Sequence, residues 1–185
     1  MPVVFGTRAS TVEEIVTVFE RYGDRVRGTY RAHYRFDQNT SDAYAVPRLE
    51  RPDSLQDNPP NAIFPWEQVF LAAAACAGSD YPMLAAHYGI PLESVDFVVE
   101  GVFDPRGEFD GLAGFAAPQD ARHCYRSLHF RVTMVSPAPR EALETIHERA
   151  LAYNMVVGAL RGIPQTNELT LVSRVPAEAM TGGVR

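Results

Sequence analysis

The stretch FPWEQVFLAAAACAGSDYPMLAAHYGI, residues 64–90, is a long and mostly apolar segment bounded by proline and glycine. Pro65 suits the first turn of a helix, where its missing N–H loses no partner, and Gly89 suits a helix end. The pattern predicts a helical segment from residue 65 to residue 88. Pro82 lies inside this segment and cannot donate to the carbonyl four residues earlier, so we expect a kink or a division there.

Two segments after this helix alternate between apolar and polar residues, as strands with one buried face do. They are residues 95–103 and residues 127–135. Their predicted inward positions are Val95, Phe97, Val99, Phe103, Leu128, Phe130, Val132 and Met134. The sequence DPRG at residues 104–107 has the composition of a turn.

The N-terminal part predicts a short helix followed by strands. Ser10-Thr11-Val12-Glu13 matches a capping box, apolar residues follow at helical spacing as far as Phe19, and Gly23 suits the end of the helix. Strands are expected within residues 26–36 and 43–46. The sequence RPDSLQDNPPNAIFP, which follows, is rich in Pro, Asp and Asn and predicts a long irregular loop.

The C-terminal part predicts a second helix and a last strand. Pro139 opens the helix, whose Leu143, Ile146 and Leu151 face a core, and the helix continues irregularly towards Leu160. The strand is ELTLVSRV, residues 168–175. The order helix, strands, long helix, strands, helix, strand indicates a single α+β domain spanning residues 1–185, without repeats or an interdomain linker.

Composition and charge limit the classes of partner. The chain has 185 residues and a formal net charge of −6, with no run of Lys or Arg, which argues against nucleic-acid and anionic-membrane partners. We find no signal peptide and expect no membrane span. Two cysteines in such a chain suggest free thiols in a reducing compartment. We therefore expect a soluble, cytoplasmic protein.

Cys76 lies within the alanine run of the long helix. At about 100° per residue it shares a helix face with Val69, Ala72, Ala73, Asp80, Met83 and His87. Cys76 is either a small apolar filler or a functional thiol, and spacing leaves both interpretations open. The Asp80 carboxylate would raise the pKa of a thiol beside it, so a nucleophilic Cys76 needs an opposing cation. Candidates from the early strands and the loop are Arg27, Arg31, Arg35 and Arg48.

The second cysteine and the histidines carry weaker signals. Cys124 has the same parity as Leu128 and Phe130, so we expect it on the apolar face of the sheet as structural filler. The five histidines show neither an HxxxH nor a CxxC pairing. We expect no metal site.

The central sequence resembles the OsmC/Ohr superfamily. The matching positions are Pro65, Glu67, Cys76, Gly89-Ile90-Pro91-Leu92, Val99-Glu100-Gly101 and Asp104-Pro105-Arg106-Gly107. The resemblance spans roughly residues 26–175, and residues 1–25 look like an added helical extension.

The resemblance implies a fold and an activity. It implies an OsmC-like α+β fold, with two curved antiparallel sheets around two long central helices in an intertwined homodimer. It also implies thiol-dependent reduction of organic hydroperoxides, in which Cys76 attacks the peroxide and becomes a sulfenic acid. In the family a second cysteine resolves that acid as a disulfide, and an external dithiol then reduces the disulfide. No cofactor beyond this external thiol is implied.

The chain departs from the family pattern at three places. Asn154 stands at the position of the resolving cysteine and cannot form a disulfide. Trp66 stands where the family has a glutamate, and Glu67, one residue later, is rotated roughly half a turn from Cys76 on the helix. The family's partner arginine has no unique match, and Arg27 and Arg48 are the candidates.

Two functional hypotheses follow. The first is a single-cysteine peroxidase of organic hydroperoxides, which predicts an accessible Cys76 of low pKa with an arginine within reach. The alternative is a divergent relative that binds or transforms a small apolar molecule without peroxide chemistry, with Cys76 beside Asp80 and no nearby cation. The candidates for contact with the substrate are Trp66, Phe70, Asp80, Tyr81 and Met83, and the alternative role of the four apolar ones is packing in the core or in a dimer.

Overall fold

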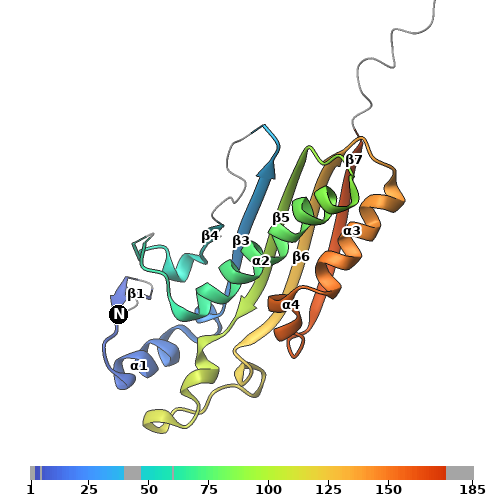
Figure 1. Ribbon diagram of the computed structural model, residues 1–185. Helices are drawn as coiled ribbons and strands as arrows, with labels where there is room; N and C mark the ends of the chain where they lie inside the picture. Colours follow the sequence, from blue (N-terminus) through green and yellow to red (C-terminus); the bar gives the residue numbers. More distant parts are fainter. Residues whose placement is uncertain (1–2, 5, 40–46, 60, 174–185) are drawn as a thin grey trace, which may run out of the picture.

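The structure of the protein, a computed structural model, describes residues 3–4, 6–39, 47–59 and 61–173. One five-stranded sheet forms a layer, and the two longest helices lie across one of its faces (Figure 1). This arrangement confirms the α+β class.

The strand order of the large sheet is β4-β3-β5-β6-β7. The strands are β3 (Gly28–Asp37), β4 (Arg48–Glu50), β5 (Ser94–Phe103), β6 (Tyr125–Ser136) and β7 (Gln165–Ser173). Neighbours are antiparallel except β6 and β7, which run parallel. The sheet is therefore mixed rather than antiparallel throughout, because the second helix carries the chain back across it before β7 begins.

The inward positions predicted for β5 and β6 are confirmed. Each of these eight side chains is buried on the helix-covered face. The opposite face is polar, and there Glu100 on β5 pairs with Arg31 on β3 and with Arg131 on β6. One face of the sheet therefore belongs to the core, and the other carries cross-strand ion pairs.

The long helix α2 (Pro65–Tyr88) continues through Pro82, so of the two outcomes expected there, a kink or a division, the division is wrong. Pro82 removes one helical hydrogen bond, but Tyr81 and Ala85 beside it are buried against the sheet. Packing of this kind usually outweighs a local loss of helix propensity. Gly89, in the left-handed conformation with φ 65°, ends the helix as predicted.

By length and composition α2 could also cross a membrane, contrary to the expectation that no segment would. Core helices share these properties when they are apolar on most sides. In this fold α2 packs on β3 and β5 through small residues such as Ala73, Ala74 and Ala77, which are fully buried.

The predicted C-terminal helix is divided into two. α3 (Arg140–Ala152) is followed by the short α4 (Met155–Ala159), with Tyr153 and Asn154 between them. The Oδ1 atom of Asn154 accepts hydrogen bonds from the backbone N–H groups of Val156 and Val157, at 3.0 and 2.9 Å. Asn154 is therefore the N-cap of α4.

The N-terminal helix α1 (Val12–Tyr22) is confirmed, with its cap one residue later than predicted. Thr11 and Glu14 form the capping box, rather than Ser10 and Glu13. In the described part of the chain the connections include five short 3₁₀ turns, at Gly23–Val26, Asp53–Leu55, Pro105–Phe109, Leu112–Gly114 and Gln119–Ala121. β1 (Val3–Val4) and β2 (Thr7–Arg8) form a second, two-stranded sheet.

The α1 segment is attached to the end of the sheet by a small apolar cluster and an ion-pair network. Phe19 packs edge-on against Phe109, with ring centroids 5.3 Å apart. Arg106 bonds to the fully buried Asp104 and to Asp24, which follows α1, with the Asp24 contact at 2.7 Å. The DPRG sequence therefore supplies both a turn and this attachment.

Two of the predicted strands lie wholly or partly outside the residues that the structure describes. The strand predicted at residues 43–46 lies outside the described residues. The last strand begins at Gln165, three residues before the predicted start, and residues 174–175 lie outside the described part.

A substitution at Gly78 tests how closely α2 approaches the sheet. A Cβ atom at residue 78 would lie 2.4 Å from Cδ1 of the buried Tyr34, so either the helix or the Tyr34 ring would have to shift. We expect Gly78→Ala to lower the free energy of unfolding by about 1–2 kcal/mol, although alanine normally strengthens a helix. Urea unfolding measures the change.

Gly158 in α4 is the matched control, because a Cβ there meets nothing within 4 Å. Gly158→Ala should leave stability unchanged or raise it by up to about 1 kcal/mol. A Gly78→Ala variant as stable as Gly158→Ala would contradict the close approach of helix and sheet.

Candidate functional site

Cys76 belongs to a three-residue polar cluster between α2 and α4. Its Sγ atom accepts a hydrogen bond from Nδ2 of Asn154 at 3.2 Å. The same Nδ2 atom donates to Oδ2 of Asp80 at 2.8 Å. The thiol is partly exposed, whereas Asn154 is buried. A single amide group therefore bridges the thiol and the carboxylate.

The orientation of the Asn154 amide is fixed by the backbone. Its oxygen accepts from two N–H groups at the start of α4, and an amide nitrogen in that place could not accept. The NH₂ group must then face Cys76 and Asp80. The cap of α4 thus positions a hydrogen-bond donor on the thiol.

Asp80 follows Cys76 by one helical turn, as its sequence spacing predicts. Burial raises the pKa of the Asp80 carboxyl, and the hydrogen bond from Asn154 offsets part of that rise. A larger fraction of Asp80 is therefore neutral at a given pH than for an exposed aspartate. The neutral form places no negative charge beside the thiol.

None of the arginines expected near Cys76 bonds to its thiol within the described residues. Arg27 forms ion pairs with Asp24, Asp104 and Asp120, at 3.2–3.3 Å. Arg48 is exposed on the edge strand β4. Within the described residues no ion pair or hydrogen bond joins an arginine to Cys76. The donor on the thiol is a neutral amide.

Arg51, which the sequence did not single out, pairs with the helix-start Glu67. The two bonds join Nε to Oε1 at 2.6 Å and a terminal guanidinium nitrogen to Oε2 at 2.9 Å. Glu67 is fully buried and also accepts from the N–H of Phe64. Arg51 further donates to the carbonyls of Pro59 and Ala62, so the pair ties the loop to the start of α2.

The residues expected to contact a substrate do not form one pocket. Phe70 and Tyr81 are fully buried in the core, and Met83 is 61% exposed. Tyr81 shares a 2.9 Å hydrogen bond with Nδ1 of His147, and burial raises the pKa of its phenol. Trp66 stacks between Phe64 and Phe103, with ring centroids 4.8 and 5.5 Å away. Asp80 is the member of this set that shares a partner with Cys76.

Cys124 packs against the main apolar core, as the interpretation as filler expects, but it lies just before β6 rather than within the strand. It precedes β6 with a positive φ of 44°, and its thiol lies beside Gly107. Burial raises the pKa of this thiol, and the carboxylates of Glu108 and Asp104 raise it further. Both cysteines are free. In the described part of the chain, no three His, Cys, Asp or Glu residues gather to hold a metal.

The raised pKa of Asp80 gives a pH-dependent prediction. Ionising Asp80 costs more in the folded chain than in the unfolded one, so this cost grows as the pH rises above about 4, the ordinary carboxyl value. Asp80→Asn removes this ionisation cost and keeps a side-chain oxygen that can accept the hydrogen bond from Asn154. We expect the variant to gain stability over wild type at pH 7 and to lose that gain towards pH 4.

Thermal unfolding at several pH values checks this, with the exposed Asp96 on β5 changed to asparagine as the control. A gain that is the same at pH 4 and pH 7 would contradict the assignment.

A family model and several solved structures are similar to this chain. The family model described as OsmC-like protein matches residues 58–168. The OsmC-like hydroperoxide resistance protein of Jannaschia sp. CCS1 superposes with a TM-score of 0.52 at 15% identity, covering 82% of this chain and 96% of that one. The OsmC-like protein of Mycoplasma pneumoniae gives a TM-score of 0.49 at 14% identity, covering 76% and 95%.

A search of curated proteins found no match. The structural likeness, at this level of identity, concerns the fold. The family model covers more than half of the sequence, including the whole of α2, the DPRG turn and α4. The chain therefore belongs to the OsmC-like protein family.

Proposed function

We propose that this protein reduces organic hydroperoxides with Cys76 as its single reacting thiol and a small external thiol as reductant. The observation that carries the proposal is the hydrogen bond from Asn154 to the partly exposed Sγ of Cys76. Cys76 matches the position of the peroxide-attacking thiol, and Asn154 matches the position of the resolving one.

The reaction then proceeds in three balanced steps. The Cys76 thiolate attacks one peroxide oxygen, the O–O bond breaks, and the leaving alkoxide takes a proton to become an alcohol. An external thiol attacks the resulting sulfenic acid and releases water, giving a mixed disulfide. A second external thiol releases Cys76 and leaves as part of a small disulfide.

Asn154 and Asp80 have separate roles in this scheme. A hydrogen bond donated to sulfur favours the charged thiolate, and Asn154 supplies it without a formal charge. Asp80 as a carboxylate opposes the thiolate, so the hydrogen bond from Asn154 has to favour the thiolate against a nearby negative charge. Since Asn154 cannot form a disulfide, turnover depends on the external thiol.

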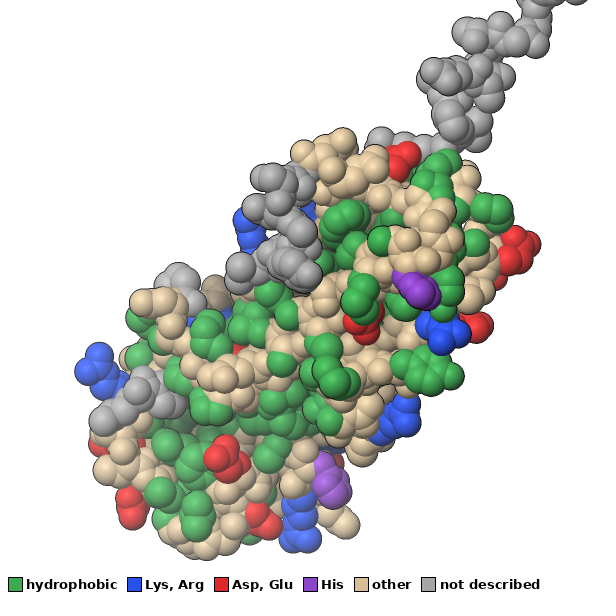
Figure 2. Space-filling model, viewed as in Figure 1, with side chains coloured by type: hydrophobic (Ala, Val, Ile, Leu, Met, Phe, Trp, Pro, Cys, Tyr) green, Lys and Arg blue, Asp and Glu red, His purple; other side chains and the backbone are tan. Residues whose placement is uncertain are grey.

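A homodimer is part of the proposal. The face of the helix layer turned away from the sheet carries exposed apolar side chains (Figure 2). Those on α2 and around α4 include Met83, Tyr88, Tyr153 and Met155. A second copy packed on this face would cover them. A cytoplasmic location, where thiol reductants are abundant, fits the same proposal.

The second candidate function is binding of a small apolar molecule without peroxide chemistry. Two observations favour it: Asp80 lies beside Cys76, and the described contacts of the thiol include no cation. The two functions separate on a single substitution of the cysteine.

The first test measures consumption of cumene hydroperoxide by wild type and by Cys76→Ser, with dithiothreitol or glutathione as reductant. We expect turnover by the wild type, its loss by at least about 100-fold in the variant, and one added oxygen at Cys76 in the intact mass. Cys124→Ser is the control and should retain activity. An inert wild type with an unmodified Cys76 would leave the second candidate function.

Asn154→Cys tests the geometry of the proposed site directly. The new thiol would stand close to where Nδ2 now contacts Sγ at 3.2 Å. After one equivalent of peroxide we expect an intramolecular disulfide with Cys76, seen as a loss of two hydrogens in the intact mass. The wild type should instead form a mixed disulfide with glutathione. Failure of the reduced variant to form the disulfide would contradict this placement of residue 154.

The dimer is tested by light scattering. The wild type should have twice the chain mass of 20.5 kDa, and Met83→Glu should shift it towards the monomer because a charge would be buried. Thr170→Glu, on the polar face of β7, is the control and should remain a dimer. A wild type of 20.5 kDa would reject the dimer.

A further inference from the structure

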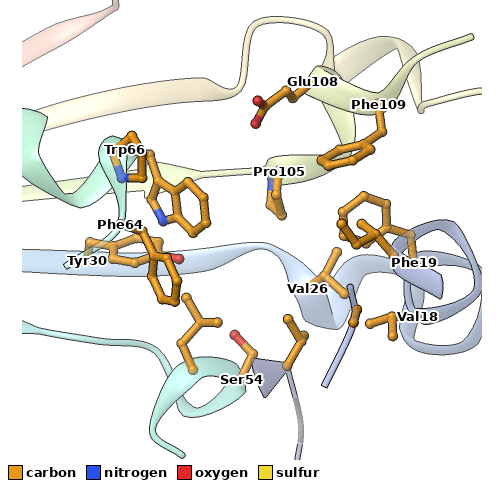
Figure 3. A pocket seen from close by; sticks show the side chains of 15 residues that line it. Val18, Phe19, Val26, Tyr30, Ser54, Phe64, Trp66, Pro105, Glu108 and Phe109 are labelled. Carbon is orange, nitrogen blue, oxygen red and sulfur yellow. The ribbon is translucent and has the colours of Figure 1, made fainter. Parts of the chain in front are cut away.

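A cavity of about 320 Å³ lies between α1 and the start of α2 (Figure 3), and Cys76 is not among its lining residues. Its aromatic walls come from four different parts of the chain: Phe19 on α1, Tyr30 on β3, Phe64 and Trp66 at the start of α2, and Phe109 in the turn after DPRG. Small-molecule pockets usually have volumes from roughly 300 Å³ upwards. The volume is therefore in the range of a ligand site rather than a packing defect.

The walls are held before any ligand arrives. Trp66 is stacked on Phe64 and on Phe103, with interplanar angles of 10° and 6°. On the opposite side the rings of Phe109 and Phe19 pack edge to face, with an interplanar angle of 77°. Rings fixed by their neighbours lose little further freedom when a ligand binds, which favours affinity.

Ser54 gives the apolar cavity a hydrogen-bonding group. It is only 4% exposed, and its hydroxyl points into the cavity (Figure 3). None of the side-chain hydrogen bonds found within the described residues involves this hydroxyl. The hydroxyl is open to the cavity rather than enclosed by protein, so a ligand with a hydroxyl or amine group can form a hydrogen bond with it.

Glu108 sets the charge preference. It is exposed, its carboxylate lies at the rim of the cavity, and no ion pair engages it in the described part of the chain (Figure 3). The chain also has a net charge of −6. A carboxylate ligand would be repelled, whereas an ammonium group would be attracted.

We propose that this cavity binds a small aromatic molecule of one or two rings that carries a hydroxyl or amine group and no carboxylate. A cavity of about 150 Å³ already accepts benzene, so twice that volume admits a substituted ring. The ring would lie between the aromatic walls, the polar group would bond to Ser54, and an ammonium would face Glu108.

The site is independent of the proposed peroxidase. Trp66 precedes Cys76 by ten residues, which is about 15 Å along a helix, and Cys76 is not among the residues that line the cavity. Binding here should therefore be the same in Cys76→Ser, so failure of one proposal does not imply failure of the other.

The test uses three matched probes: 4-(trifluoromethyl)benzyl alcohol, 4-(trifluoromethyl)benzylamine and 4-(trifluoromethyl)benzoate. Trp66 is the only tryptophan of the chain and lines the cavity, so its emission reports binding directly. Fluorine NMR of each probe gives an independent affinity. At pH 7 we expect the alcohol and the amine to bind at least about tenfold more tightly than the benzoate.

Glu108→Gln and Ser54→Ala identify the groups that select the ligand. Glu108→Gln should bring the affinities for the amine and the benzoate to within about threefold of each other. Ser54→Ala should weaken binding of the alcohol by about fivefold or more. Glu108 is exposed, so its variant is expected to fold, and circular dichroism verifies this. The proposal is overturned if no probe changes Trp66 emission at millimolar concentration, or if neither variant alters the preference.

Discussion

The close packing of α2 on the sheet is the constraint on which the rest of the structure depends. Gly78 leaves room for the ring of Tyr34, and Gly101 on β5 leaves room for Phe70 of the helix. Small residues on both surfaces let the helix axis approach the strands, so that the aromatic rings fill the remaining space. This approach fixes the height of Cys76 above the sheet and therefore its distance from α4.

The parts of the fold that could be predicted are those determined by local pattern. β5 and β6 each bury one face, so alternation predicted their inward residues, such as Phe97 and Phe130, correctly. The unbroken course of α2 through Pro82 could not be predicted, because burial on the sheet outweighs the local preference of proline. The parallel pairing of β7 with β6 was also hidden, since alternation does not reveal strand direction.

Some features of the candidate site could likewise be predicted from the sequence, and others could not. The helical relation of Cys76 to Asp80 follows from their four-residue spacing, and resemblance drew attention to Asn154. The pairing of Arg51 with Glu67 depends on a loop that folds back over sixteen residues, for which the sequence has no periodic signal. The aromatic cavity is less predictable still, because its walls come from separate segments that meet only in three dimensions.

The two hydrogen-bonding ends of Asn154 connect the chemistry of sulfur to the stability of a helix. Its oxygen holds the first turn of α4, while its nitrogen contacts the Cys76 thiol. An oxygen or a mixed disulfide added to the sulfur would stand close to this nitrogen. Any displacement of the amide would remove the cap of α4. A chemical change at one atom on α2 would thereby reach the backbone of a different helix, where amide hydrogen exchange would register it.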